Sequence, residues 1–355
     1  MSNYQQQRYL LMTLDPVHIG TGGYRLGRVD LSIVREPGTN VPKIPGTGFS
    51  GAARSYAAYL YGKRDCAGKG GKAGEKHCAQ PTCPICYTFG YTKGTVSYSG
   101  TVSLFDAHIL LFPVHSMAGP VWVSTKQRLD GADFDVSLPP GEEEKASAQG
   151  EKAFLTWVWK KPLNLGWLLL EVAPEKATVK PPEGSRWEDK DEWKAIAERI
   201  VLVDEKLFGQ VVNSNLEVRT SVSINPATGA AEEGALFTHE AIPRAAFLYC
   251  DVVMDDYREA FPSQERLEEW GKLSKDEKEK RRIKEDERKD ALQRYQRLKL
   301  TWNSPLDVVK SGLKMAELLG VGGMGTRGFG RIRIVGEPWN VPLSINEEVR
   351  HEQQA

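Results

Sequence analysis

The sequence predicts an α+β fold in which helices cover one face of an antiparallel sheet. Residues 7–14 (QRYLLMTL) are typical of a buried strand, and residues 101–112 (TVSLFDAHILLF) predict a second one. Amphipathic helices are expected over 52–60 and over 305–319, and the second is followed by a loop and the strand RIRIV. The order strand, helix, strand, helix, strand, interrupted by insertions, is the basis of this prediction.

The remaining elements have weaker patterns. The apolar alternation from Leu31 to Val34 indicates part of a strand, and either Thr47 or Ser50 is expected to cap the helix that follows. The stretch 168–172 is strand-like, and a helix is predicted over 189–200.

We predict a single domain over residues 1–355 with four insertions, at 62–95, 125–200, 204–245 and 255–300. In the third insertion, residues 211–238 alternate polar and apolar side chains around the turn sequence NPATG, which predicts a β-hairpin. In the fourth, residues 264–299 place opposite charges at i,i+3 and i,i+4, which predicts a solvated helix or helix pair.

Composition excludes some classes of function. No apolar run of roughly 18 residues occurs, so neither a transmembrane helix nor a membrane partner is expected. The N-terminus lacks a secretory signal, and the cytoplasm is the expected location. The net charge is zero, which argues against a generic basic nucleic-acid binder. Residues 1–64 nevertheless carry eight Lys/Arg against three Asp/Glu, and residues 301–335 carry five against two, so one positive surface can exist on a neutral chain.

Residues 18–54 form the most informative window, because a lone acid, Asp30, lies among glycines and arginines. This arrangement suits an anionic polymer and its cleavage. Asp30 could act as a general base or hold a divalent cation, Mg²⁺ or Mn²⁺; the alternative is an ion pair with Arg28 or Arg35. His18 could assist proton transfer, stabilise the glycine turn or touch RNA.

A second glycine-rich loop, GVGGMGTRGFG at 320–330, follows a helix and precedes a strand. Nucleotide-binding loops have the reverse order, and no Walker lysine is present, so an ATPase is excluded. We expect Arg327 and the amides of Gly323, Gly325 and Gly328 to contact phosphates. The alternative is a tight connection that needs glycine for its backbone angles.

Four cysteines, Cys66, Cys78, Cys83 and Cys86, have the spacing C-x11-C-x4-C-x2-C. Thiolates at such spacing are typical of a tetrahedral structural zinc site, and the alternative is free thiols brought together by chance. His77 could replace one thiolate. The fifth cysteine, Cys250, lies in an apolar run and is expected in the core.

Three ordered segments resemble a known family. The glycine loop near the C-terminus is similar to the signature loop of the RAMP superfamily, the RNA-binding subunits of CRISPR effector complexes. The segments HIGTG, GRVDLSIVRE and KIPGTGFSGAAR, together with residues 202–242, resemble the backbone subunit of type III effectors, most of all the Cmr (type III-B) kind. The cysteine insertion resembles those of some Csm-type and related backbone subunits.

The resemblance implies an RRM-like (ferredoxin-like) palm, with many copies stacked along a guide RNA beside other subunits of the complex. It implies that the 204–245 insertion is a thumb that enters the guide–target duplex and flips a nucleotide. It also implies that Asp30 cleaves target RNA at regular intervals.

The family often has Ser-Leu-Lys where this chain has Gly48-Phe49-Ser50, which puts one phosphate contact in doubt. We expect Lys43, Ser50 and Arg54 to contact RNA in its place. Two rival functions remain open: a structural RAMP subunit that only binds guide RNA, and a zinc-dependent nucleic-acid enzyme.

Overall fold

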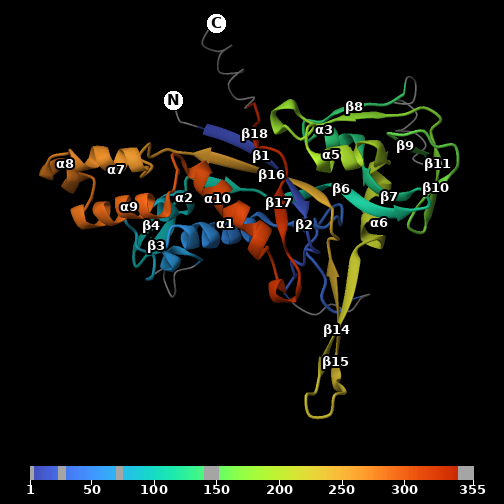
Figure 1. The fold of residues 1–355 in the computed structure, drawn as a ribbon, viewed down its shortest axis with the longest axis horizontal. Helices are drawn as coiled ribbons and strands as arrows, with labels where there is room; N and C mark the ends of the chain where they lie inside the picture. The colour runs from blue at the N-terminus through green and yellow to red at the C-terminus, as the bar shows by residue number, and fades with distance from the viewer. Residues whose placement is uncertain (1–3, 23–28, 69–74, 140–151, 343–355) are drawn as a thin grey trace, which may run out of the picture.

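The computed structural model describes residues 4–22, 29–68, 75–139 and 152–342. Figure 1 shows an elongated body from which a single hairpin projects. Within the described residues, no helix is long and apolar enough to cross a membrane.

A sheet of twelve strands runs through the body. Strand β1 (Tyr4–Thr13) lies next to the last strand of the main order, and it pairs antiparallel with β16 (Phe247–Asp255) on one side and with β17 (Ile332–Ile334) on the other. Strand β6 (Ala107–Ser116) pairs antiparallel with the far edge of β16. The sheet continues from β6 through β7 (Gly119–Ser124), β13 (Ile200–Leu202), β9 (Lys152–Leu155), β11 (Leu168–Val172) and β10 (Leu163–Leu165). Short strands β2 (Lys43–Ile44), β5 (Val102–Leu104) and β18 (Trp339–Asn340) pair with β6, β16 and β1.

Two helices pack against one another beside this sheet, as predicted. They are α1 (Gly46–Leu60) and α10 (Pro305–Leu319). The helices approach closely at Gly312, where a Cβ atom would lie 2.2 Å from the carbonyl oxygen of Ala53. Helix α1 begins after Pro45, which makes no side-chain cap, so the predicted capping by Thr47 or Ser50 is wrong and both residues lie inside the helix.

The opposite face of the sheet is also covered, which corrects the prediction of helices on one face only. Residues alternate along β1, so Tyr9 and Leu11 join the core beneath α1 and α10, whereas Leu10 points to a second core. Trp187 and Trp193 fill that second core. It is closed by α3 (Lys126–Asp130), β8 (Asp135–Ser137), β12 (Thr178–Lys180) and α5 (Asp191–Ile196). The helix predicted over 189–200 therefore ends early, because Ile200 already belongs to β13.

A third core joins the cysteine insertion to the charged segment. The charged segment forms α7 (Gln264–Gly271), α8 (Lys275–Lys280) and α9 (Glu285–Leu298), which confirms the predicted helices. Its apolar side chains are buried: Tyr295 of α9 packs on Tyr61 and Trp302 at ring-centroid distances of 5.9 and 6.4 Å. The insertion itself contains α2 (Pro84–Phe89) and a small hairpin, β3 (Tyr91–Lys93) and β4 (Val96–Tyr98).

The predicted hairpin is present as β14 (Glu217–Ile224) and β15 (Ala231–Ala241), and it extends away from the body in Figure 1. In the turn, the Asn225 side-chain oxygen accepts a hydrogen bond from the Ala227 N–H at 2.9 Å. Residues 211–214 are not part of the hairpin, because they end helix α6 (Glu205–Ser214).

The strand predicted at Leu31–Val34 is absent as a regular element. The segment instead makes isolated bridges, Gly20 with Ile33 and Leu31 with His239. Partners on two different sides prevent a continuous ladder, and they bring Asp30 to the base of the projecting hairpin.

Candidate functional site

The Asp30 side chain is held by the hairpin strand β15. Its Oδ2 accepts hydrogen bonds from the Thr238 backbone N–H at 2.8 Å and from the Thr238 hydroxyl at 3.0 Å. The same hydroxyl accepts from the Asp30 backbone N–H at 3.0 Å. On either side, the Leu31 N–H donates to the Thr238 carbonyl and the Glu240 N–H donates to the Leu31 carbonyl, both at 3.1 Å. The acid is thus fixed to the base of the hairpin.

These bonds set the charge of the acid. The two Thr238 donors, the backbone N–H first, hold the pKa of Asp30 below its usual range. The side chain is exposed, and within the described residues its Oδ1 has no hydrogen-bond partner. Asp30 is therefore a permanent carboxylate at neutral pH with one oxygen open to solvent, which makes it a weak base and a good ligand for a cation.

The ion-pair alternative for Asp30 fails for Arg35. Arg35 Nη2 lies 2.6 Å from Glu240 Oε1, and its Nε donates to Asn213 Oδ1 at 3.0 Å. Arg28 lies outside the described residues.

His18 is buried next to strand β15, the strand that holds Asp30. Its Nδ1 lies 2.7 Å from the Glu240 carbonyl oxygen, which can only accept, so Nδ1 carries the proton. The His18 carbonyl in turn accepts from the Gly323 N–H at 3.0 Å. His18 therefore ties together the first glycine window, strand β15 and the second glycine loop, which matches the turn-stabilising alternative.

A second histidine, His239, was missed by sequence analysis. It is buried, and its ring lies edge-on to that of His18 at 5.9 Å. Burial lowers the pKa of His239, and a hydrogen bond to the Arg219 backbone only partly opposes this effect. Within the described residues its Nδ1 has no hydrogen-bond partner. Thr238, His239 and Glu240 lie in the thumb segment, and nothing in their local sequence marks them as partners of a window some 200 residues earlier.

The glycines of the 320–330 loop allow the backbone to pack closely against other segments. Gly322 has φ +81°, and a Cβ atom there would lie 2.5 Å from the His18 carbonyl oxygen. The N–H of Gly323 is bonded to His18 and that of Gly328 to Gly325, so the predicted amide contacts from Gly323 and Gly328 to phosphate are wrong for these two donors. Gly325 is exposed, and its contact with RNA stays a prediction.

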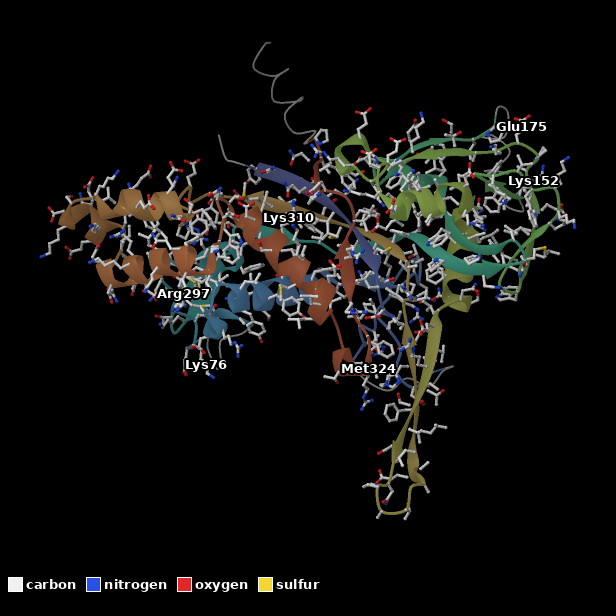
Figure 2. All side chains as sticks on the ribbon, viewed as in Figure 1. Lys76, Lys152, Glu175, Arg297, Lys310 and Met324 are labelled. Carbon is white, nitrogen blue, oxygen red and sulfur yellow. The ribbon has the colours of Figure 1, made fainter. Side chains whose placement is uncertain are left out.

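Arg327, from the same loop, is exposed, and within the described residues it makes no ion pair. The loop is joined to the hairpin because the Arg219 guanidinium of β14 stacks over the Phe329 ring at 4.9 Å. Figure 2 shows the loop, labelled at Met324, beside the base of the hairpin. Arg327 is a free cation at the candidate site.

Lys43 is not free to bind phosphate. Its Nζ lies 2.5 Å from Asp106 Oδ2, and Asp106 Oδ1 accepts from the Gly46 N–H at 2.8 Å. The lysine thus neutralises the acid that supports the start of α1. Ser50 lies half-buried on α1, and its contact with RNA stays a prediction.

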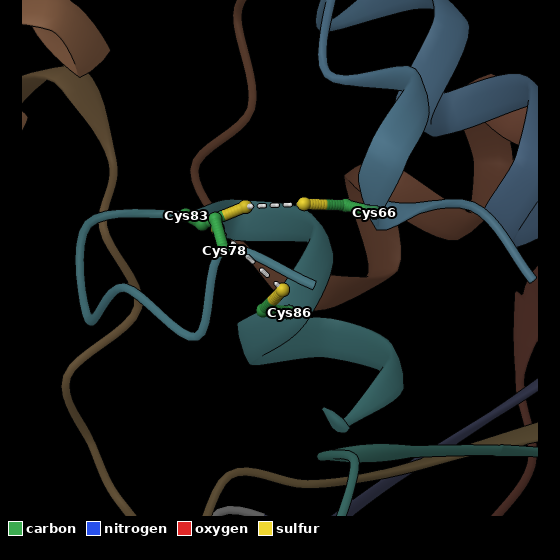
Figure 3. Close-up of side chains that lie close together, drawn as sticks. All are labelled: Cys66, Cys78, Cys83 and Cys86. Carbon is green, nitrogen blue, oxygen red and sulfur yellow. Dashed lines mark hydrogen bonds between the residues drawn. The ribbon is translucent and has the colours of Figure 1, made fainter. Parts of the chain in front are cut away.

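The four predicted cysteines come together (Figure 3). All four Sγ atoms lie within 4.8 Å of one another; Cys78 and Cys86 are 3.7 Å apart, and Cys66 and Cys83 are 4.0 Å apart. Tetrahedral zinc with Zn–S bonds of about 2.3 Å needs sulfur separations of about 3.8 Å. The cluster could therefore bind a metal of this kind.

His77 is outside this cluster, so its role as an alternative ligand is wrong. Its ring nitrogens lie within hydrogen-bond distance of Arg54, Gly68 and Thr92. Arg54 was expected on RNA, and this too is corrected. Arg54 Nε donates to the Cys66 carbonyl at 2.8 Å, and burial lowers the arginine's pKa. Negative charge on the four cysteines would act in the opposite direction and raise that pKa.

Comparison with known proteins gives consistent results. Residues 10–333 match the family described as the RAMP superfamily. The chain is 28% identical over 252 residues to the CRISPR system Cmr endoribonuclease Cmr4 of Pyrococcus furiosus, which covers 67% of this chain and 78% of that protein.

Solved structures share the fold. The type III-B Cmr-beta complex in its apo state matches with a TM-score of 0.55 at 12% identity, covering 93% of this chain and 96% of the other. The same kind of complex bound to cognate target RNA gives 0.52 at 13%, covering 94% and 96%. Oligomeric Cmr4 from Pyrococcus furiosus gives 0.51 at 16%, covering 96% and 99%.

Proposed function

The chain belongs to the RAMP superfamily, and we propose that it is the backbone subunit of a type III CRISPR effector complex of the Cmr kind. In this role it binds guide RNA along a filament of its own copies, beside other subunits, and cleaves the complementary target RNA. The observation that carries the proposal is the attachment of an open carboxylate, Asp30, to the base of the projecting hairpin. The 28% identity to a Cmr endoribonuclease supports it.

The RNA-binding palm is the unit formed by β1, α1, β6, β16, α10 and β17. Its strands lie in the order β6-β16-β1-β17, all antiparallel, with both helices packed together. In the unit's own numbering the order is 2-3-1-4, which is the ferredoxin-like arrangement of RRM domains. The helix-to-strand loop with Arg327 leads into its last strand.

The hairpin is the thumb. Apolar side chains that would normally be buried are exposed along it, namely Val218, Val222, Ile224 and Leu236, with Leu236 66% exposed. Such side chains can wedge between bases and separate them. We propose that the thumb splays one target nucleotide and delivers the adjacent phosphate to Asp30, which lies at its base.

Cleavage of RNA needs little more than alignment, because the ribose 2′-OH is the nucleophile. A splayed nucleotide can place that oxygen in line with the leaving 5′-oxygen, and positioning of this kind can lower a barrier by roughly 7–11 kcal/mol in ideal cases. Asp30 holds its charge at the phosphate, with Oδ2 fixed by Thr238 and with no partner for Oδ1 among the described residues. A Mg²⁺ or Mn²⁺ ion bound at Oδ1 and completed by RNA oxygens would supply positive charge to the phosphorane.

The cysteine cluster holds structural zinc in this proposal. Four protein ligands leave no open position for catalysis, and the sulfurs lie in the third core, whereas Asp30 is exposed at the base of the hairpin. This argues against a zinc-dependent nuclease. The zinc would close an insertion whose apolar contacts come from α1 and α10 as well as from the α7–α9 helices.

The test compares guide-loaded complexes with wild-type chain and with Asp30→Ala. We expect the variant complex to assemble and to bind target RNA with unchanged affinity, while cleavage is lost. Undiminished cleavage would show a structural RAMP subunit, with the nuclease elsewhere. If cleavage instead disappears on zinc removal from an intact wild-type complex, the zinc-enzyme alternative is correct.

A further inference from the structure

One arginine near Asp30 in the sequence is bonded to both legs of the hairpin. Arg35 Nη2 lies 2.6 Å from Glu240 Oε1, close to the end of β15. Its Nε donates to Asn213 Oδ1 at 3.0 Å. Asn213 lies in the last turn of α6, which leads into β14, the first leg of the hairpin (Figure 1). We call Arg35, Asn213 and Glu240 the arginine clasp.

The arginine clasp also holds the backbone on which the acid lies. Arg35 Nη1 donates to the Ile33 carbonyl at 3.0 Å, and the Ile33 N–H donates to Glu240 Oε2 at 3.4 Å. The Asn213 side-chain amide donates to the Asn40 carbonyl at 3.0 Å, which fixes the chain beyond Arg35. The three nitrogens of the guanidinium therefore reach three different segments: β15, α6 and the acid-bearing segment itself.

The ion pair of the arginine clasp is largely buried. The Arg35 side chain is 19% exposed and that of Glu240 is 11% exposed. Removal of the arginine would leave the Glu240 carboxylate buried without its charged partner, which is strongly unfavourable. A guanidinium is also planar, with its donors in a fixed fork, so it fixes direction as well as distance. The clasp therefore holds the two legs and the segment between them in one arrangement.

The Asp30 carboxylate does not reach both legs by its own bonds. Within the described residues, its hydrogen bonds come from Thr238 of β15 alone. Leu31 continues along the same leg, because its N–H donates to the Thr238 carbonyl and its carbonyl accepts from the Glu240 N–H, both at 3.1 Å. The link between the acid-bearing segment and the other leg is supplied by Arg35 and Asn213.

We propose that Arg35 is a positioning residue for Asp30, which fixes the acid relative to both legs of the hairpin. Arg35 acts through the Ile33 backbone and through Glu240, and it does not touch the Asp30 carboxylate. Misplacement of a reacting group by about 1 Å can cost roughly a hundredfold in rate. The clasp should therefore affect the cleavage rate rather than the affinity for RNA. This inference rests on the proposed function, because it concerns the cleavage proposed for Asp30.

The test is Arg35→Met in the guide-loaded complex, with Arg128→Met as the matched control. Arg128 makes a comparable ion pair, with its Nη2 2.6 Å from Glu205 Oε1, at the opposite end of the same helix α6. In Arg35→Met we expect the single-turnover cleavage rate at saturating target to fall about tenfold or more, with the affinity for target unchanged. Both quantities should stay at their wild-type values in Arg128→Met.

Amide hydrogen exchange reports on the clasp without any cleavage. The N–H groups of Leu31 and Glu240 join the acid-bearing segment to β15. We expect both to exchange about tenfold faster or more in Arg35→Met than in wild type or in the control. Unchanged exchange overturns the proposal. Faster exchange with an unchanged cleavage rate also overturns it, because the clasp would then hold the chain without positioning the acid.

A second variant covers the case in which Arg35→Met does not assemble. Asn213→Ala removes the acceptor of Arg35 Nε and the bond to the Asn40 carbonyl, but it leaves the ion pair with Glu240 intact. We expect smaller changes of the same kind in rate and exchange, and wild-type values of both would overturn the proposal. Cleavage retained in Asp30→Ala refutes the proposed function, whereas the exchange measurement does not depend on that chemistry, so the two failures are distinguishable.

Discussion

Asp30 and Thr238 are 208 residues apart in the sequence, yet they share three hydrogen bonds between 2.8 and 3.0 Å. The carboxylate is therefore positioned by the strand that forms the thumb. Any movement of the hairpin base moves the acid with it, so under the proposed function the position of the hairpin in RNA is coupled to the position of Asp30.

Replacing Thr238 tests this coupling. Thr238→Val keeps the shape and the backbone donor but removes the hydroxyl bond to Asp30. Asp30 Oδ2 then keeps only the backbone donor and is placed less firmly, so single-turnover cleavage should fall by about tenfold. Target affinity should not change, and Thr238→Ser should restore the rate. Equal rates for the valine variant and wild type would show that the backbone donor alone is sufficient.

The pH dependence of cleavage follows from the same bonds. Thr238 holds the pKa of Asp30 below its usual value of 3.8, so the carboxylate stays charged through mild acid. A depressed pKa means that the stabilising bonds are fully present above the usual value and are lost as the pH falls through the lower, folded value. The acid limb of the cleavage profile should move to higher pH in Thr238→Val. An identical acid limb in both proteins would exclude Asp30 as the group that titrates there.

Metal content tests the cysteine cluster. We expect one zinc ion per chain by elemental analysis and a loss of that ion in Cys83→Ser, because three thiolates hold zinc less tightly than four. Cys250→Ala is the matched control, since Cys250 is a buried thiol of the main core rather than of the cluster. Zinc retained in Cys83→Ser would contradict a four-thiolate site.

Arg54 should support the cluster rather than bind RNA. Arg54→Met removes a half-buried cation near the four cysteines and its bond to the Cys66 carbonyl. We expect faster zinc loss to a chelator and a lower melting temperature, with the affinity of the complex for RNA unchanged. Arg64→Met, which alters an exposed arginine, is the control. Weaker RNA binding without any change in zinc retention would indicate that Arg54 contacts RNA.

Within the part of the chain that the structure describes, Arg327 makes no ion pair and lies exposed near the candidate site. Arg327→Ala should weaken guide RNA binding uniformly across sequences and reduce the salt dependence of affinity by about one counterion. Arg331→Ala is a suitable control, because Arg331 is already paired with Asp15 at 2.5 Å. An equal effect of both substitutions would indicate loss of general charge rather than a phosphate contact.

Local patterns were enough to predict several elements. Helix α10 occupies the predicted residues 305–319, since a capping serine, a proline at its first position and an apolar stripe all agree. Strand β11 also occupies the predicted residues. The cysteine cluster was predictable because ligand spacing is itself local, and its four sulfurs do converge.

Partners distant in the sequence were not predictable. Lys43 and Arg54 had the charge expected of phosphate ligands, but Asp106 and the cysteine insertion engage them in the fold. The role of Thr238 depends on how β15 passes Leu31, and no single-sequence pattern encodes that register. The glycines of the C-terminal loop were assigned to ligand contact, whereas Gly322 is required because the His18 backbone leaves no room for a Cβ atom.

The exposed thumb has a consequence for the chain before it meets RNA. A two-stranded ribbon whose outer edges, within the described residues, are unpaired beyond its base, with exposed valine, isoleucine and leucine side chains, is the type of element that promotes aggregation. A free subunit thus carries a hazard that only assembly removes. If RNA is supplied as fast as the chain is synthesised, few copies remain unassembled with this hairpin exposed.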